Sequence, residues 1–250
     1  MATNASTTLP VAAGRFFFGM ALTCALVAFL GFAPTYWAPL AAGSLAEAQV
    51  VNLHAVLFSA WSLFFMIQAG LAESGRIARH RALGLVGISL ASMMLLVGLA
   101  TAIHSAEAHI AAGFGERARG FLIVPVSTIL FFAAAVAIAI SNRRQPEIHM
   151  RWLLVANVAI LNAATARIVR FLRFGTDVPP GPPPIEVSVV SGLTADMLIV
   201  AAIIHDWRTR GRVHPAYWIG GGALLAIQLG RIPVSKTPQW QAVADWLLGF

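Results

Sequence analysis

Two apolar stretches joined by a short basic segment constrain the fold of this chain more than any other feature. Residues 50–71 and 82–103 contain no Asp, Glu, Lys or Arg, whereas residues 73–81 between them hold three arginines and a histidine. About 20 helical residues rising ~1.5 Å each are enough to cross the ~30 Å hydrocarbon core of a bilayer. The pattern therefore predicts a helical hairpin of a polytopic membrane protein, with its turn at the membrane surface.

The composition excludes a water-soluble domain. Of the 250 residues, 58% are hydrophobic and 11% charged, and one soluble core cannot hide that much apolar surface. The net charge of +7 comes almost wholly from arginines in short loops, so we interpret it as a topology signal for the lipid bilayer and not as a nucleic-acid-binding surface. Cys24 is the only cysteine, which excludes an intrachain disulfide and a cysteine-based metal cluster.

We expect one all-α domain over residues 1–250, folded as a transmembrane bundle of about seven helices. Residues 236–248 add a short amphipathic helix, whose tryptophans at helical spacing favour a position at the membrane interface. The predicted spans cover residues 15–32, 50–71, 82–103, 121–141, 150–171, 187–205 and 216–232.

Basic loops predict the orientation of this bundle. Arginines cluster in the loops after the second, fourth and sixth predicted spans, and these loops share one side if every span crosses. The positive-inside rule makes that side cytoplasmic, so we expect the N-terminus inside and the C-terminus outside. The clustered residues are Arg76, Arg79, Arg81, Arg143, Arg144, Arg151, Arg208, Arg210 and Arg212.

Asp196 is the only carboxylate deep within a predicted span, and an unpaired ion there would be costly. We expect Arg167 or Arg170 on the preceding span to be its counter-charge. Asn157 and Arg167 belong to a polar stripe on that helix, because ~100° of rotation per residue brings His149 and Arg167 to one face. Such a stripe lines a proton, ion or ligand path, or holds helices together through buried pairs; both interpretations stay open.

Histidines at the other ends of the spans offer a metal site. His104 and Glu107 are three residues apart and share a helix face if the helix continues past residue 103. Together with His109 and His54 they could supply nitrogen and oxygen ligands. The alternative is that His104 and His109 are ordinary interfacial loop residues, since their spacing matches no established ligand motif.

His80 and His149 open the third and fifth predicted spans on the basic side, so they could approach each other at one depth. Two such histidines could bind a haem b axially. The alternative is that both are anchors that meet lipid phosphate at the membrane surface.

Four motifs stand out by their polar residues. They are Asn52-Leu-His54 in a span that ends with Gln68, Arg79-His-Arg-Ala-Leu-Gly84, Pro146-Glu-Ile-His149-Met-Arg-Trp152 with Arg167 later in the same helix, and His205-Asp-Trp-Arg-Thr-Arg-Gly-Arg-Val-His-Pro215. They resemble motifs of bacterial predicted multi-pass membrane proteins of the domain-of-unknown-function class. The resemblance covers roughly residue 52 to the C-terminus and implies a multi-pass protein of the bacterial inner membrane, but that class has no established activity to transfer.

The layout also resembles, more weakly, cytochrome b561 and ferric-reductase bundles, in which paired histidines on adjacent helices hold two haems. This chain departs from that pattern because the predicted span 121–141 has no histidine. At most one haem is then implied, through His80 and His149 or through His54 and His104. A retinal protein is disfavoured, because its Schiff base requires a lysine in a span and Lys236 is the only lysine.

Three functions remain open. The chain could be a haem- or metal-binding electron-transfer protein, a transporter or membrane sensor for a small molecule or ion, or a structural subunit of a membrane complex. A homo-oligomer is compatible with each of them. No nucleophile–base pair, phosphate-binding glycine loop or HExxH helix is present, which argues against a hydrolase or kinase without deciding whether the protein is an enzyme.

Overall fold

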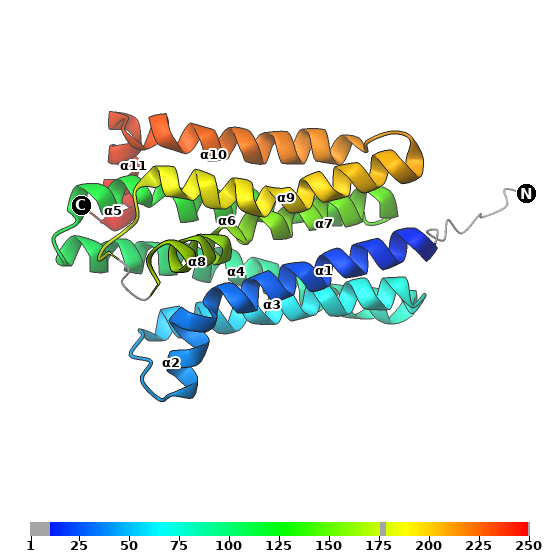
Figure 1. Ribbon diagram of the computed structural model, residues 1–250, viewed down its shortest axis with the longest axis horizontal. Helices are drawn as coiled ribbons and strands as arrows, with labels where there is room; N and C mark the ends of the chain where they lie inside the picture. Colours follow the sequence, from blue (N-terminus) through cyan, green and yellow to red (C-terminus); the bar gives the residue numbers. More distant parts are fainter. Residues whose placement is uncertain (1–10, 176–178, 250) are drawn as a thin grey trace, which may run out of the picture.

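The computed structural model describes residues 11–175 and 179–249, in which every regular element is a helix. The long helices run side by side along one axis (Figure 1). In chain order the elements are α1 (Val11–Phe32), the π-helical turn η1 (Ala33–Trp37), α2 (Ala38–Ala41), α3 (Gln49–Glu73), α4 (Ile77–Ala111), α5 (Gly115–Phe121), α6 (Ile123–Ser141), α7 (Pro146–Ile160), α8 (Asn162–Phe174), α9 (Ile185–Arg210), the π-helical turn η2 (Tyr217–Gly221), α10 (Gly222–Ser235) and α11 (Pro238–Leu248).

The prediction of an all-α bundle is confirmed, and the number of spans is only partly supported. Five helical stretches in the described part of the chain are long and apolar enough to cross a membrane. The bent pair α7 and α8 makes a sixth if both halves belong to one span. The expected seventh span over residues 216–232 is helical, in η2 and α10, but is not among these candidates.

The outward faces of the bundle are apolar. Leu85 is 71% exposed, Leu96 is 68% exposed and Leu172 is 79% exposed, and many other large apolar side chains point outward. A water-soluble monomer rarely leaves so many large apolar side chains in water, whereas acyl chains of a membrane would cover them. The surface and the long apolar helices together fit a membrane-spanning protein.

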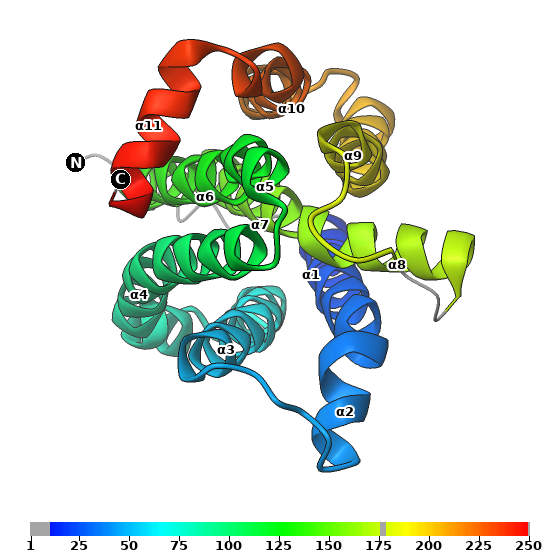
Figure 2. The same cartoon turned by 90° about the vertical axis from the view of Figure 1, so that its left-hand side faces the viewer.

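Helix α7 lies near the middle of the bundle. Viewed along the bundle axis, α6 and α7 are surrounded by α1, α3, α4, α9 and α10 (Figure 2). The run from Leu154 to Ala159 on α7 is buried without interruption, and the main apolar core forms around it with side chains from α1, α3, α4, α6, α9 and η2. This run is apolar except for Asn157, whose side chain is hydrogen-bonded to Trp61, so neighbouring helices can pack around it on every side.

The helix predicted over residues 150–171 is divided into α7 and α8, which meet at Leu161 with a bend of 41°. Thr165 donates a hydrogen bond to the Ser191 carbonyl (2.8 Å) and also lies 3.1 Å from the Leu161 carbonyl. Threonine side chains that bond to carbonyls of the preceding turn often bend helices. The expected polar stripe from His149 to Arg167 is therefore wrong, because α8 leans away from the bundle (Figure 2).

The two ends of the bundle differ in character. The α3–α4, α6–α7 and α9–η2 turns, which carry the basic clusters, lie together at one end, on the right in Figure 1. We call this the basic end. Short helices α2, α5 and α11 lie at the opposite end, where Thr237 caps α11 by accepting a hydrogen bond from the Trp240 amide. Trp240 is buried and donates to the Arg119 carbonyl, whereas Trp246 is 76% exposed.

Candidate functional site at the basic end

Three of the sequence motifs converge at the basic end. His80 comes from the first turn of α4 and His149 from the first turn of α7, next to the turns that join α3 to α4 and α6 to α7. Their ring centroids are 6.2 Å apart and their planes are perpendicular. The sequence prediction that these two histidines approach each other at one depth therefore agrees with the geometry.

Each of these rings is held by a backbone carbonyl. His149 Nδ1 lies 2.9 Å from the Ala139 carbonyl and His80 Nδ1 lies 3.3 Å from the Gln68 carbonyl. Because a carbonyl only accepts, Nδ1 must carry the proton in both rings, and Nε2 then has a free lone pair in the neutral form. Within the described residues, neither Nε2 atom makes a hydrogen bond, and neither is fully buried. Both lone pairs are therefore available to a ligand.

A buried ion pair lies at the same end of the bundle. Arg151 on α7 donates from Nε to Asp206 Oδ2 on α9 (2.9 Å) and from Nη2 to Oδ1 (2.5 Å). The two side chains are 2% and 0% exposed. Arg151 also donates to Glu147 Oε2 (2.6 Å), which in turn accepts from Arg210. Bidentate geometry and the additional partners offset the cost of burying these charges.

These contacts change one expectation and add a buried carboxylate. Arg151 is not a surface residue that marks topology, because it belongs to the buried pair that joins α7 to α9. Asp206, one residue past the predicted span 187–205, is completely buried one turn before the end of α9. Sequence reasoning missed the pair because both residues lie next to loops full of arginine, where charge normally indicates solvent.

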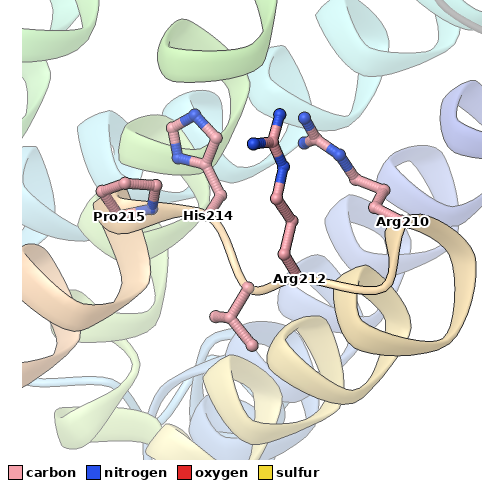
Figure 3. Close-up of a pocket in the computed structure, with 5 residues that line it drawn as sticks. Arg210, Arg212, His214 and Pro215 are labelled. Atoms are coloured by element: carbon pink, nitrogen blue, oxygen red, sulfur yellow. The ribbon is translucent and has the colours of Figure 1, made fainter.

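The loop from α9 to η2 closes over Asp206. The His214 amide donates to Asp206 Oδ2 (3.2 Å), and His214 Nδ1 accepts from the Ala216 amide (3.1 Å). A pocket of about 300 Å³ opens here, lined by Arg210, Arg212, Val213, His214 and Pro215. In Figure 3 the two arginines and the histidine extend to the same side of the loop, so their donors can meet an anionic group.

His214 is neutral in this setting. Burial lowers the pKa of its imidazole below the usual 6.5, and the charges of Arg151 and Arg210 lower it further. Because Nδ1 accepts the Ala216 N–H, the ring proton is on Nε2, which is left as a donor toward the pocket. The pocket therefore presents the Arg212 guanidinium, the Arg210 guanidinium that is already paired with Glu147, and one neutral donor.

The polar residues expected to form a path are not brought together. Asn157 accepts a hydrogen bond from Trp61 Nε1 (3.0 Å) and joins α7 to α3. Arg167 donates to Thr35 Oγ1 (3.1 Å) and covers the Phe32 ring, while Arg170 donates to the Pro179 carbonyl (3.1 Å). Neither arginine is the counter-charge of Asp196, because the bend at Leu161 carries α8 toward η1.

Asp196 instead contacts α10. Gln228 Nε2 lies 3.4 Å from Asp196 Oδ1, and the guanidinium of Arg231 is near enough for the two charges to interact. Arg231 donates to Ser127 Oγ (2.9 Å) and Thr128 Oγ1 (2.7 Å) on α6. Arg231 lies in the last predicted span, so the general rule that an intramembrane charge needs a partner could have identified it from the sequence.

The other expected histidine sites do not form a group. α4 continues to Ala111, so His104 and Glu107 lie on one helix, but His109 lies ~140° around it from His104. His54 stacks on Phe58 with 3.9 Å between ring centroids, and within the described part of the chain it makes no hydrogen bond or ring contact with His104. In the described part of the chain, no three His, Cys, Asp or Glu side chains could hold one metal ion.

Comparisons with known proteins add no assignment: no family model, no curated protein and no solved structure matches this chain.

Proposed function

We propose that this protein is a membrane electron-transfer component in which His80 and His149 bind the iron of a haem b. The observation that supports it is the pair of rings with both Nδ1 atoms tied to carbonyls and both Nε2 atoms free. Ligating histidines in metalloproteins characteristically donate their other ring N–H to such a group, which fixes the tautomer. The two ring centroids are 6.2 Å apart, so His80 and His149 could hold one iron between them.

A haem fits this donor set better than a bare ion. A bare transition-metal ion usually needs three or four protein ligands, and the described residues offer no group of three. A porphyrin supplies four nitrogens itself, so its iron requires only two histidines from the protein. Arg79 and Arg81 flank His80 and could pair with the acidic side chains of the porphyrin.

The bound haem would supply one-electron chemistry, because iron with two histidine ligands has no open position for a substrate. A chain with one haem must exchange electrons with a second redox centre. That centre would belong to a second copy of the chain or to a partner in a membrane complex.

We propose that the basic end faces the cytoplasm, in the inner membrane of a bacterium, with seven crossings that include α10. The clustered arginines support this orientation.

The test is an absorption spectrum of protein purified in detergent from haem-replete cells, oxidised and then reduced with dithionite, together with metal analysis. We expect a b-type spectrum and one iron per chain. His80→Ala and His149→Ala should lose both, whereas His104→Ala should keep them. His149→Met should retain haem at a higher reduction potential, because methionine is an alternative axial ligand.

Two results would overturn the proposal. One is wild-type protein without a haem spectrum from haem-replete cells. The other is a spectrum that survives both alanine substitutions at His80 and His149 but not the one at His104, which would assign the haem to the opposite end. Elution of each variant as a single species in size-exclusion chromatography separates loss of haem from loss of the fold.

A further inference from the structure

A second polar cluster lies inside the bundle, away from the histidine pair. It is formed by Asp196 on α9, Gln228 and Arg231 on α10, and the hydroxyls of Ser127 and Thr128 on α6. Gln228 is 1% exposed and Arg231 is 2% exposed, while Asp196 is half-buried. Arg231 makes its hydrogen bonds to neutral hydroxyls, and no salt bridge within contact distance joins it to a carboxylate among the described residues.

Two buried atoms of this cluster have no partner. Gln228 Oε1 is an unpartnered acceptor and Arg231 Nη1 is an unpartnered donor. Leaving such groups unpaired in a dry interior costs about 1–3 kcal/mol each, so an ordered water or ligand is expected where they occur. Residues 228 and 231 are three apart on α10 and share a helix face, so one small molecule could reach both atoms.

We propose that Asp196, Gln228 and Arg231 form a hydrated proton-binding site within the membrane. The water donates to Gln228 Oε1 and accepts from Arg231 Nη1, which satisfies both orphaned atoms. The proton from the aqueous phase binds a carboxylate oxygen of Asp196 and leaves it as a neutral carboxyl group. The charge of the cluster then changes from zero to +1, and no electron is transferred.

Within this cluster, Asp196 is the group that binds the proton. From α10, Arg231 is the charged group that acts on it, and Gln228 is its hydrogen-bond partner. From α6 come only hydroxyls, which contact Arg231. On α8, Arg167 and Arg170 extend toward Thr35 and Pro179. The weak 3.4 Å contact from Gln228 can be released without breaking an ion pair.

The close packing of α10 on α9 holds the cluster together. A Cβ at Gly192 would lie 2.8 Å from the Gln228 side-chain amide, so any larger residue there would displace the amide from its place beside α9. Gln228 is thereby kept next to Asp196, one turn further along α9.

The test is infrared difference spectroscopy on the full chain in lipid nanodiscs, titrated from high to low pH. We expect a protonated-carboxyl C=O band that shifts in D₂O and is lost in Asp196→Asn. The matched control is Asp245→Asn, which removes a carboxylate paired with Arg119 at the far end of the bundle and should keep the band. A band that persists unchanged in Asp196→Asn overturns the proposal.

A second variant keeps the test decisive if Asp196→Asn fails to fold. Arg231→Gln removes the nearby cation that favours the carboxylate, so the band should appear at higher pH. An unchanged midpoint in Arg231→Gln overturns the proposed cluster. Because His80→Ala leaves these residues untouched, it should keep the band whether or not the protein binds haem, which separates this inference from the proposed function.

Discussion

At the scale of single residues, Arg151–Asp206 is the ion pair of the described residues in which both side chains are buried. Two charges are removed from water, and the low polarity of the interior makes each of them dependent on the other. Glu147 and the His214 amide satisfy atoms that the pair alone would leave open. The pair therefore fixes α7 against α9 at the basic end. Its contribution to stability becomes measurable when one member is removed.

We predict that Asp206→Asn lowers the free energy of unfolding by about 3–5 kcal/mol, because the Arg151 charge stays buried without its counter-ion. Unfolding by heat or denaturant in detergent measures the effect. Arg212→Met is the control, since Arg212 is exposed and its loss should change stability by less than about 0.5 kcal/mol. The double variant Arg151→Met with Asp206→Leu should recover much of the loss. Equal stability of Asp206→Asn and Arg212→Met would contradict the prediction.

At the scale of helices, α8 packs against α1 through a close contact at Gly31. A Cβ at Gly31 would lie 2.6 Å from the Ala164 carbonyl oxygen and 2.8 Å from the Ala164 Cβ. The obstacle is largely backbone, which cannot move aside like a flexible side chain. α1 and α8 can cross at this point only because residue 31 has no side chain.

Gly31→Ala should therefore destabilise the protein by about 1–3 kcal/mol through overpacking. Gly19→Ala on the same helix is the matched control, because a Cβ there meets nothing within 4 Å. Alanine has the higher helix propensity, so the control should be neutral or stabilising by up to about 1 kcal/mol. The thermal unfolding midpoints of the two variants in detergent measure this difference. Equal midpoints for Gly31→Ala and Gly19→Ala would contradict the prediction, because they would mean that α1 and α8 move apart at little cost.

At the scale of the whole molecule, charge is distributed unequally between the ends of an apolar bundle. The basic end collects three turns with their arginines, and the opposite end has the short helices α2, α5 and α11 (Figure 1). In a membrane, such an asymmetry favours the orientation with the arginines in the cytoplasm. The histidine pair would then lie near the cytoplasmic surface.

This orientation predicts a labelling pattern for introduced cysteines in a Cys24→Ala background. Ser44→Cys, exposed before α3, should react with a membrane-impermeant maleimide in intact spheroplasts. Ser74→Cys, exposed in the α3–α4 turn at the basic end, should react only after the membrane is permeabilised. The reverse pattern would invert the orientation, and equal labelling of both sites in intact spheroplasts would argue against a membrane-spanning bundle.

The sequence by itself determined the class of fold. Apolar runs long enough to span a bilayer, separated by basic turns, leave a helical bundle as the architecture that satisfies the backbone in lipid. It also predicted that His80 and His149 would approach, because both open helices next to basic turns. These inferences depend on periodicity and on position along a helix, which are local properties of the chain.

Only the tertiary structure decided which polar groups pair. Asp196 contacts Gln228 and not Arg167, Arg151 binds Asp206, and α8 departs from the direction of α7. Each of these outcomes depends on the rotation and crossing of helices, and spacing along one helix says nothing about the face that a distant helix presents. The cost of removing two ions from water also decides which residues pair. A buried ion pair is favourable only in the geometry that the packed helices allow.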